Sequence, residues 1–210
     1  MRTVPRLYAI IDPTLLNDGS VSGVSKFARE LIVGGATLIQ LRDKREDPIE
    51  ILSQAREMRR IAGASSESGV RLIMNDRADL CLAADFDGVH VGQDDLSPEG
   101  ARRVVGRQRW VGISTHNPEQ VRVADQSDAD YIAIGPIFQT QSKQNPDPVV
   151  GLEGIRTARD LTKKTLVAIG GLDLENCRSA IDAGANAIAV ISSLLEYPRK
   201  RTEEFLRKLE

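Results

Sequence analysis

Acidic residues follow two of the apolar runs in this sequence, close to where each run ends. Asp76 comes two residues after the run at 71–74, and Asp95 comes four residues after the run at 88–91. Mg²⁺ is commonly held by one or two carboxylates together with substrate phosphate oxygens and water, so carboxylates meeting at one place predict a magnesium site at Asp76 and Asp95. The competing interpretation is that each carboxylate only caps or solvates the helix that follows it.

Basic residues occupy the same kind of position. Arg42 and Lys44 follow the run at 38–41, and Lys143 lies in the segment after the run at 131–134. Cations gathered around a metal site fit a ligand with several negative charges, and a diphosphate is such a ligand. A single Lys or Arg is more often an exposed surface residue, so their shared position at the ends of runs is what favours a binding role.

Glycine and serine residues late in the chain predict a second anion site. Gly170-Gly171 follows the run at 166–169, and Ile191-Ser192-Ser193 stands at the end of the run at 187–191. Glycines let backbone N–H groups approach a phosphate closely, and eight-stranded barrels often bind phosphate at the loops after their last two strands. The alternative is that the two glycines only relieve a positive φ angle.

The histidines and cysteines suggest no further chemistry. His90 lies within an apolar run and is expected to be a hydrogen-bonded core residue. His116 follows the run at 110–113, where a supporting role is as reasonable as a catalytic one. Cys81 and Cys177 each lie in an apolar helical pattern, far in sequence from any second metal ligand, and are expected to be reduced core thiols. These positions support neither a Ser-His-Asp nor a Cys-His arrangement.

The elements that must position these residues are short apolar runs, rich in β-branched side chains, that keep returning along the chain. They lie at residues 7–11, 38–41, 71–74, 88–91, 110–113, 131–134, 166–169 and 187–191. Stretches with helical spacing separate them, as at Val24, Phe27 and Leu31. Strands buried on both faces that alternate with amphipathic helices predict a parallel sheet. Eight such units predict a closed (β/α)₈ TIM barrel, α/β in class, as a single domain over residues 1–210.

In such a barrel the carboxyl ends of the strands form the active site, which would bring the polar residues together. The alternative fold is a doubly wound open sheet. The eighth run and the lack of a G-x-G-x-x-G turn after the first run both argue against it.

Cap and turn residues agree with the alternation. Ser97-Pro98 and Asn117-Pro118 each supply an N-cap followed by proline at the first helical position. Gly34, Gly69 and Gly184 fall where helices should end before the next strand. The connection at about 137–151 is long and rich in Gln, Asn, Lys and Pro, so we expect it to form a mobile lid.

The charge balance limits the class of partner. The 210 residues include 28 Lys and Arg against 30 Asp and Glu, a net charge of -2 that gives no field able to hold nucleic acid or an anionic membrane. The sequence has neither an apolar signal region nor a run long enough to span a bilayer. We therefore expect a soluble cytoplasmic protein that acts on small molecules, with its oligomeric state left open, a homo-oligomer included.

The residues at the ends of the runs follow a known pattern, and the chain resembles the thiamine phosphate synthases over nearly its whole length. The most specific segments are Gln40-Leu-Arg-Asp-Lys44, Asn75-Asp-Arg77, His90-Val-Gly-Gln-Asp-Asp95, Gly112-Ile-Ser-Thr-His116, Gly135-Pro-Ile-Phe-Gln-Thr-Gln-Ser-Lys143 and Ala168-Ile-Gly-Gly171. The resemblance implies a Mg²⁺-dependent transferase of thiamine biosynthesis. Such an enzyme transfers the hydroxymethylpyrimidine group from its diphosphate to the thiazole nitrogen of hydroxyethylthiazole phosphate, giving thiamine phosphate and pyrophosphate.

The same resemblance implies a role for individual residues. Asp76 and Asp95 would hold the metal, and Gln40 and Ser114 would position the pyrimidine. The residues that grip the diphosphate would be Arg42, Lys44, Asn75 and Lys143. Those that hold the thiazole phosphate would be Thr140, Ser142, Gly171 and Ser192, with Ile191 also among the substrate-binding residues. Those that act in catalysis would be Arg42, Ser114 and Lys143.

Two residues depart from the family's pattern in the sixth connection, where the family usually reads Phe-Pro-Thr-x-Thr-Lys. Ser142 replaces the second threonine and keeps a hydroxyl that should still bind phosphate. Gln139 replaces the proline, which removes a restriction on the backbone and should make this connection more flexible before substrate binds.

Two other functions compete with this one. A thiazole tautomerase relative, an isomerase on the same barrel, would be expected to lack the second metal carboxylate, so Asp95 favours the synthase. A non-catalytic barrel that binds a vitamin phosphate would have no need for a metal-activated leaving group. The set of Arg42, Asp76, Asp95 and Lys143 therefore speaks against it.

Overall fold

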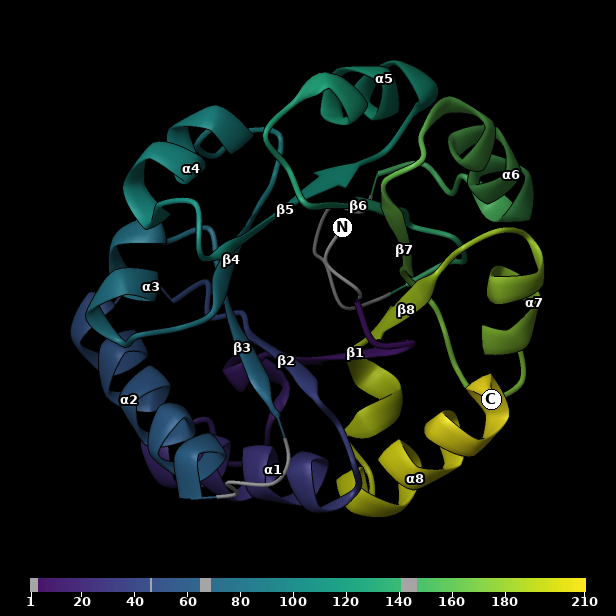
Figure 1. Ribbon diagram of the computed structural model, residues 1–210. Helices are drawn as coiled ribbons and strands as arrows, with labels where there is room; N and C mark the ends of the chain where they lie inside the picture. The colour runs from purple at the N-terminus through teal and green to yellow at the C-terminus, as the bar shows by residue number, and fades with distance from the viewer. Residues whose placement is uncertain (1–3, 46, 65–68, 141–146) are drawn as a thin grey trace.

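The strands of this protein close into one parallel barrel. The structure is a computed structural model, and it describes all residues except 1–3, 46, 65–68 and 141–146. The strands pair in the order β1 to β8, and β8 returns to β1. The helices form a ring outside the strands (Figure 1). The predicted (β/α)₈ barrel is confirmed.

The limits of the elements agree with the apolar runs to within one or two residues. The strands are β1 (Leu7–Ile11), β2 (Leu38–Leu41), β3 (Arg71–Asn75), β4 (Gly88–Val91), β5 (Trp110–Thr115), β6 (Tyr131–Ile134), β7 (Thr165–Ile169) and β8 (Ala187–Val190). The α-helices are α1 (Val21–Val33), α2 (Pro48–Ala64), α3 (Ala78–Ala83), α4 (Pro98–Val105), α5 (Pro118–Gln126), α6 (Gly151–Leu161), α7 (Cys177–Asp182) and α8 (Pro198–Leu209). Two 3₁₀ turns complete the set, η1 (Pro13–Leu15) and η2 (Ser192–Leu194).

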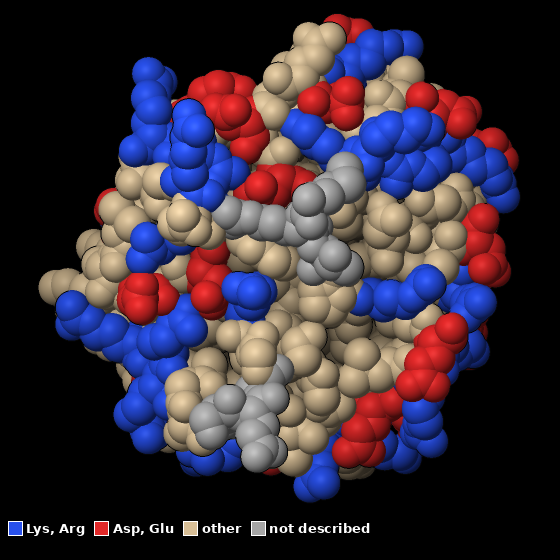
Figure 2. Space-filling model, viewed as in Figure 1, with Lys and Arg blue, Asp and Glu red and all other residues tan. Residues whose placement is uncertain are grey.

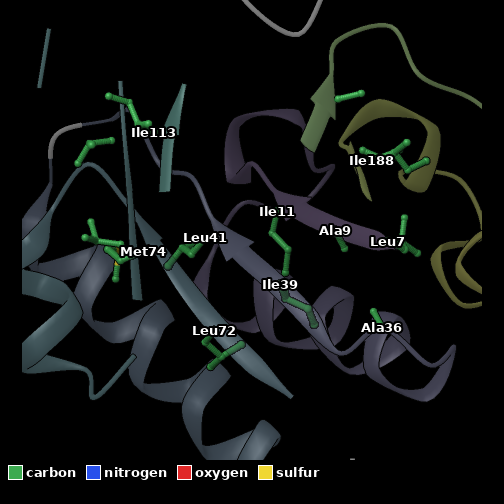
Figure 3. Close-up of a cluster of buried hydrophobic side chains, with 14 of the residues drawn as sticks. Leu7, Ala9, Ile11, Ala36, Ile39, Leu41, Leu72, Met74, Ile113 and Ile188 are labelled. Atoms are coloured by element: carbon green, nitrogen blue, oxygen red, sulfur yellow. The ribbon is translucent and has the colours of Figure 1, made fainter. Parts of the chain in front are cut away.

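Alternate residues of each strand face opposite sides of the barrel wall. Leu7, Ala9 and Ile11 of β1 belong to a large cluster shared with the helices, and Figure 3 shows this cluster continuing through β2 and β3. Tyr8 and Ile10 belong instead to a second cluster, made of strand residues and Val4, that fills the barrel interior. A step of two residues therefore keeps a side chain on the same side of the wall.

Polar caps fix where several helices begin. The side chains of Ser97 and Asn117 accept hydrogen bonds from the backbone N–H of the residue three positions on, and proline follows each of them. Gly34 ends α1, while Gly69 and Gly184 take positive φ angles before β3 and β8. The predicted helix starts at Ser97 and Asn117 and the stops at Gly34 and Gly184 are confirmed, while the stop at Gly69 follows residues outside the described part of the chain.

Both cysteines are free and buried. Burial raises the pKa of the Cys81 thiol to about 12 and raises the pKa of Cys177 as well. Neither thiol is therefore a reactive thiolate near neutral pH, as expected for core residues.

Charges of both signs are interspersed over the face of the molecule seen in Figure 2. Some ion pairs lie within one helix, such as Arg60 with Glu57 at 2.6 Å on α2. This mixture agrees with the small net charge, since neither positive nor negative side chains dominate the face in this view. In the part of the chain that the structure describes, no helix is long and apolar enough to cross a membrane.

Gly112, in the middle of β5, makes room for the ring of Tyr131. A Cβ at this position would lie 2.1 Å from Cζ of Tyr131. Gly112→Ala is therefore expected to lower the free energy of unfolding by about 1–3 kcal/mol, the usual cost of overpacking a core, as measured by urea denaturation. Gly63→Ala is the control, because Gly63 is exposed on α2 with open space around its Cβ. This control should be neutral or stabilising by up to about 1 kcal/mol. Equal stability of Gly112→Ala and the wild type would contradict the close approach.

Candidate active site at the carboxyl ends of the strands

A cavity of about 510 Å³ opens at the carboxyl ends of the strands. Its wall carries most of the residues predicted for the site, namely Arg42, Lys44, Asn75, Asp76, Asp95, Ser114, Thr140 and Ile191. The closed barrel therefore brings together residues that are up to about 150 positions apart in the sequence, as its topology predicts.

Asp76 and Asp95 border this cavity from the loops after β3 and β4. Oδ2 of Asp76 accepts hydrogen bonds from Asn75 Nδ2 at 2.7 Å and from Lys44 Nζ. Oδ2 of Asp95 accepts one from the backbone N–H of Gly92 at 2.8 Å. The two predicted metal ligands thus lie at one site.

The helices that follow these carboxylates do not use them as caps. Helix α3 begins after Arg77 with no side-chain cap, and α4 is capped by Ser97. The capping interpretation of Asp76 and Asp95 is therefore wrong, and their carboxylates are available to the cavity.

Asp76 has a raised pKa and a left-handed backbone conformation. Burial raises the pKa of its carboxyl, the nearby Asp95 carboxylate adds to this effect, and the Lys44 ammonium opposes it. Its φ angle of 59° lies in the left-handed region, and its backbone N–H donates to the carbonyl of His90 at 2.7 Å. Such a conformation costs a non-glycine residue about 1–3 kcal/mol and persists where the surroundings fix it, which is common at functional sites.

These oxygens suit a hard divalent cation. Among the described residues, no three His, Cys, Asp or Glu side chains are grouped so as to hold a metal by themselves. Asp76 and Asp95 provide two carboxylates, and a cation between them would relieve the repulsion that raises the pKa of Asp76. Two carboxylates completed by substrate oxygens and water fit Mg²⁺, whereas soft metals take thiolate or imidazole ligands.

Arg42 is anchored by an acidic residue that was not among the predicted site residues. Asp12 is only 3% exposed, and its Oδ2 accepts a hydrogen bond from Arg42 Nη1. Its Oδ1 accepts from the backbone N–H of Thr14 at 3.0 Å and from the Thr14 hydroxyl at 2.6 Å. Arg42 also borders the cavity, and its guanidinium has further N–H groups that can donate to a ligand. The signal that could have found Asp12 is its position directly after the first apolar run.

A chain of buried hydrogen bonds crosses the barrel interior. Gln40 Nε2 donates to the Tyr8 hydroxyl at 2.6 Å, and the Tyr8 and Tyr131 hydroxyls are 2.9 Å apart. The Tyr131 hydroxyl lies 3.0 Å from Nδ1 of His90, whose Nε2 lies 2.8 Å from Oγ of Ser114. We call Gln40, Tyr8, Tyr131, His90 and Ser114 the interior relay. It confirms His90 as a hydrogen-bonded core residue.

Burial keeps the middle of the interior relay uncharged. It raises the pKa of the Tyr8 and Tyr131 hydroxyls, and it lowers the pKa of His90 to about 4. Near neutral pH each phenol therefore carries its proton, and the imidazole carries one N–H. Tyr8 and Tyr131 lie within apolar runs, and the runs alone do not indicate which hydroxyls meet.

The predicted second anion site is brought to the main cavity only in part. Gly170 and Ile191 border the cavity. Ser192 begins η2 and borders two neighbouring hollows instead. Gly171 follows Gly170 with a φ angle of 66° and accepts a hydrogen bond at its carbonyl from Asn176. Of this predicted site, Ile191 therefore borders the main cavity and Ser192 does not.

Gly170 and Gly171 also hold the base of the sixth connection. A Cβ on Gly170 would lie 2.6 Å from Cβ of Pro136, and one on Gly171 would lie 2.5 Å from the carbonyl oxygen of Gln139. Both residues have positive φ angles, and two backbone hydrogen bonds join this segment to the end of β7. The conformational interpretation of these glycines is therefore correct, and it leaves room for the phosphate interpretation.

Ser142 and Lys143 lie outside the described residues, together with the central part of the predicted lid. Thr140, just before them, is half-buried and borders the cavity. The roles of Ser142 and Lys143 and the mobility of the lid stay predictions from the sequence.

His116 connects two of the loops at the cavity. Its Nδ1 lies 2.6 Å from the carbonyl oxygen of Gly135, and its Nε2 lies 3.5 Å from a carboxylate oxygen of Asp147. Its backbone N–H donates to the side chain of Gln120 at 2.7 Å. These contacts favour the supporting role over the catalytic one.

Comparison with known proteins agrees with this geometry. The sequence matches the thiamine monophosphate synthase family over residues 7–194. It is 58% identical over 207 residues to the thiamine-phosphate synthase of Koribacter versatilis, covering 98% of this chain and 96% of that protein. It is 42% identical over 191 residues to that of Halalkalibacterium halodurans, covering 90% and 87%. The structure is similar to the thiamine phosphate pyrophosphorylase from Pyrococcus furiosus, with a TM-score of 0.83 and 33% identity over 97% of this chain and 94% of that one.

The burial of neutral His90 predicts a loss of stability in acid. The folded protein holds the pKa of His90 at about 4, against an ordinary value of 6.5 in the unfolded chain. Between these values the unfolded chain binds more protons, so the free energy of unfolding falls as the pH falls, by about 3 kcal/mol in total from this residue. Urea denaturation from about pH 7 down to about pH 4 measures this slope.

His90→Gln should remove that part of the pH dependence, since glutamine does not titrate. An identical slope in wild type and His90→Gln would contradict the assignment.

Proposed function

The chain belongs to the thiamine monophosphate synthase family, and we propose that its barrel cavity is where a pyrimidine diphosphate and a thiazole phosphate are joined. Its function is that of a thiamine-phosphate synthase, a transferase of thiamine biosynthesis acting on small molecules. The observation that carries the proposal is the match over residues 7–194, which spans the strands and loops that build the cavity.

The proposed reaction exchanges one bond at the pyrimidine methylene carbon. The bond from this carbon to the diphosphate oxygen breaks, and its electron pair leaves with pyrophosphate. The thiazole nitrogen of hydroxyethylthiazole phosphate then forms the new bond with its lone pair, which gives thiamine phosphate. No covalent enzyme nucleophile is required, so the protein contributes by orienting the substrates and stabilising charge on the leaving group.

Arg42, Lys44 and Asn75 are the proposed partners of the diphosphate, with Lys143 completing the set. The first three border the cavity, and Arg42 is kept in place by its ion pair with Asp12. Arginine and lysine neutralise negative charge as it develops on a departing phosphate, and this role makes Arg42 and Lys143 candidates for catalysis.

Asp76 and Asp95 are the proposed ligands of Mg²⁺. When bound, the ion would add positive charge beside the leaving diphosphate. The support lies in the two cavity-facing carboxylates and in the raised pKa of Asp76, which burial and Asp95 cause. In the described contacts, Lys44 pairs with Asp76. A cation held by the two carboxylates would free the Lys44 ammonium for a phosphate oxygen.

The thiazole phosphate is proposed to lie toward the loops after β7 and β8. Ile191 borders the cavity there, and the backbone N–H of Ser192 stands at the start of η2, before any hydrogen bond within that turn. Thr140 borders the cavity from the sixth connection. Gly171, with a positive φ angle and no side chain, would let the backbone approach the phosphate, and Ser142 would add a hydroxyl.

The two competing functions are not favoured. A thiazole tautomerase would not need Asp95, which borders the cavity beside Asp76. A non-catalytic binder of a vitamin phosphate is at odds with relatives that are 58% and 42% identical and named as synthases.

A direct assay tests the proposed function. Purified protein is mixed with hydroxymethylpyrimidine diphosphate, hydroxyethylthiazole phosphate and Mg²⁺, and the products are separated by chromatography. Thiamine phosphate and pyrophosphate should appear in equal amounts and should stop forming when EDTA is added. Absence of thiamine phosphate with both substrates present would refute the proposal.

The metal assignment predicts that Asp76→Asn and Asp95→Asn lower kcat on Mg²⁺ by orders of magnitude, because each loses a charged ligand beside the leaving group. Asparagine tolerates the left-handed backbone at position 76, so the fold should persist, as checked by circular dichroism. Asp160→Asn is the control, because Asp160 is exposed on α6, and it should keep full activity. Wild-type turnover in either cavity variant would exclude that residue as a metal ligand.

A further inference from the structure

The interior relay joins Gln40 and Ser114, which the family resemblance assigns to the pyrimidine, through side chains that have little contact with solvent. Ser114 lines the cavity, and Gln40 is 2% exposed. Tyr8 and Tyr131 are 1% and 0% exposed, and His90 is 7% exposed. The interior of such a barrel is usually filled by branched apolar side chains, and an unpaired buried hydroxyl there is unfavourable. Packing alone therefore does not explain why a polar chain runs from Gln40 to Ser114 through the barrel interior.

The rings that carry the relay are fixed in place. The Tyr131 ring stacks on the His90 ring with centroids 5.5 Å apart and an angle of 27° between planes. The Tyr8 ring meets the Tyr131 ring edge-on, with centroids 5.9 Å apart and an angle of 76° between planes. Gly112 leaves the space that the Tyr131 ring fills. Rotation of the hydroxyl hydrogens is then the main freedom left to these groups.

The direction of the hydrogen bonds follows from how many protons each group has. Gln40 Nε2 donates to Tyr8, so the single proton of Tyr8 is donated to Tyr131. The proton of Tyr131 is then donated to Nδ1 of His90, which leaves the imidazole proton on Nε2. Nε2 donates it to Oγ of Ser114.

This direction decides what the two ends offer to a ligand. Gln40 has its carbonyl Oε1 left over, which accepts, beside the second N–H of its amide, and Ser114 keeps its own O–H, which donates. If the Gln40 amide were turned over, every hydrogen bond of the relay would reverse, and Ser114 would accept while Gln40 donated. In either direction one end donates and the other accepts.

We propose that Tyr8 and Tyr131 are positioning residues that set the specificity for the pyrimidine, because the relay through them keeps a hydrogen-bond acceptor at one of Gln40 and Ser114 and a donor at the other. An aminopyrimidine offers the matching pair, because its amino group donates and its ring nitrogens accept. A ring with a methoxy group in place of the amino group only accepts. The relay could supply two donors to it, the Ser114 O–H and the second amide N–H of Gln40, only by leaving the buried Oε1 of Gln40 without a partner. The inference rests on the proposed function, since it takes the pyrimidine as the ligand of Gln40 and Ser114.

The test uses variants that remove one relay oxygen and keep the ring. Tyr131→Phe and Tyr8→Phe each interrupt the relay at a different point. Tyr197→Phe is the matched control, because Tyr197 is 72% exposed and lies outside the relay. Calorimetry gives the Kd of each protein for the pyrimidine diphosphate and for its methoxy analogue, without thiazole phosphate so that no turnover occurs.

The wild type should bind the amino compound more tightly than its methoxy analogue. In both relay variants the ratio of the Kd for the methoxy analogue to the Kd for the amino compound should fall by about tenfold or more, because Gln40 and Ser114 can then reorient independently. Tyr197→Phe should keep the wild-type ratio. The Kd for inorganic pyrophosphate should be the same in all four proteins, because the hydrogen bonds described for the side chains of Arg42 and Lys44 go to Asp12 and Asp76 and not to the relay.

A wild-type ratio in the relay variants would overturn the inference, and so would a wild type that binds both compounds equally. A merely structural role would reduce the fraction of active protein without changing the ratio, so that result also counts against it. If one variant fails to fold, the other decides. Failure of the proposed function is seen separately, as missing thiamine phosphate in the activity assay.

Discussion

The alternation of side chains along parallel strands is the constraint on which this site depends. In β2, the step of two residues that turns Leu38 into the barrel interior also turns Gln40 inward and brings Arg42 to the cavity. In β1 the same alternation leads from Tyr8 through Ile10 to Asp12, the residue directly after the strand. A shift of one residue in either strand would exchange these groups for Leu and Ile side chains and fill the cavity with apolar atoms.

Within the cavity, charges of opposite sign hold one another in place. Arg42 is paired with buried Asp12, and Lys44 is paired with Asp76. A buried carboxylate without a partner would be strongly unfavourable, so each ion pair allows a charged group to stand at the cavity before any ligand enters. A ligand that brings both a cation and phosphates could replace these partners one for one. The same fold can therefore be stable when empty and reactive when filled.

Much of the fold was predictable because its signals are local. Apolar runs, N-caps such as Ser97, and residues following each run are all read within a few positions of one another. The remainder depends on pairs distant in sequence. The hydroxyls of Tyr8 and Tyr131 meet across 123 positions, and nothing near either residue indicates the other. The left-handed backbone of Asp76 and the displacement of Ser192 from the main cavity also follow from tertiary packing.

The contact between the sixth connection and the end of β7 has a consequence for how such barrels can be altered. Gly135 would bring a Cβ within 2.1 Å of the carbonyl of Ile169, just as Gly170 and Gly171 would collide with the opposite segment. Neither side can therefore accept ordinary residues while the other stays as it is. A loop grafted from this protein into another scaffold would need the seventh-strand glycines to travel with it, so the two segments form a single transplantable module.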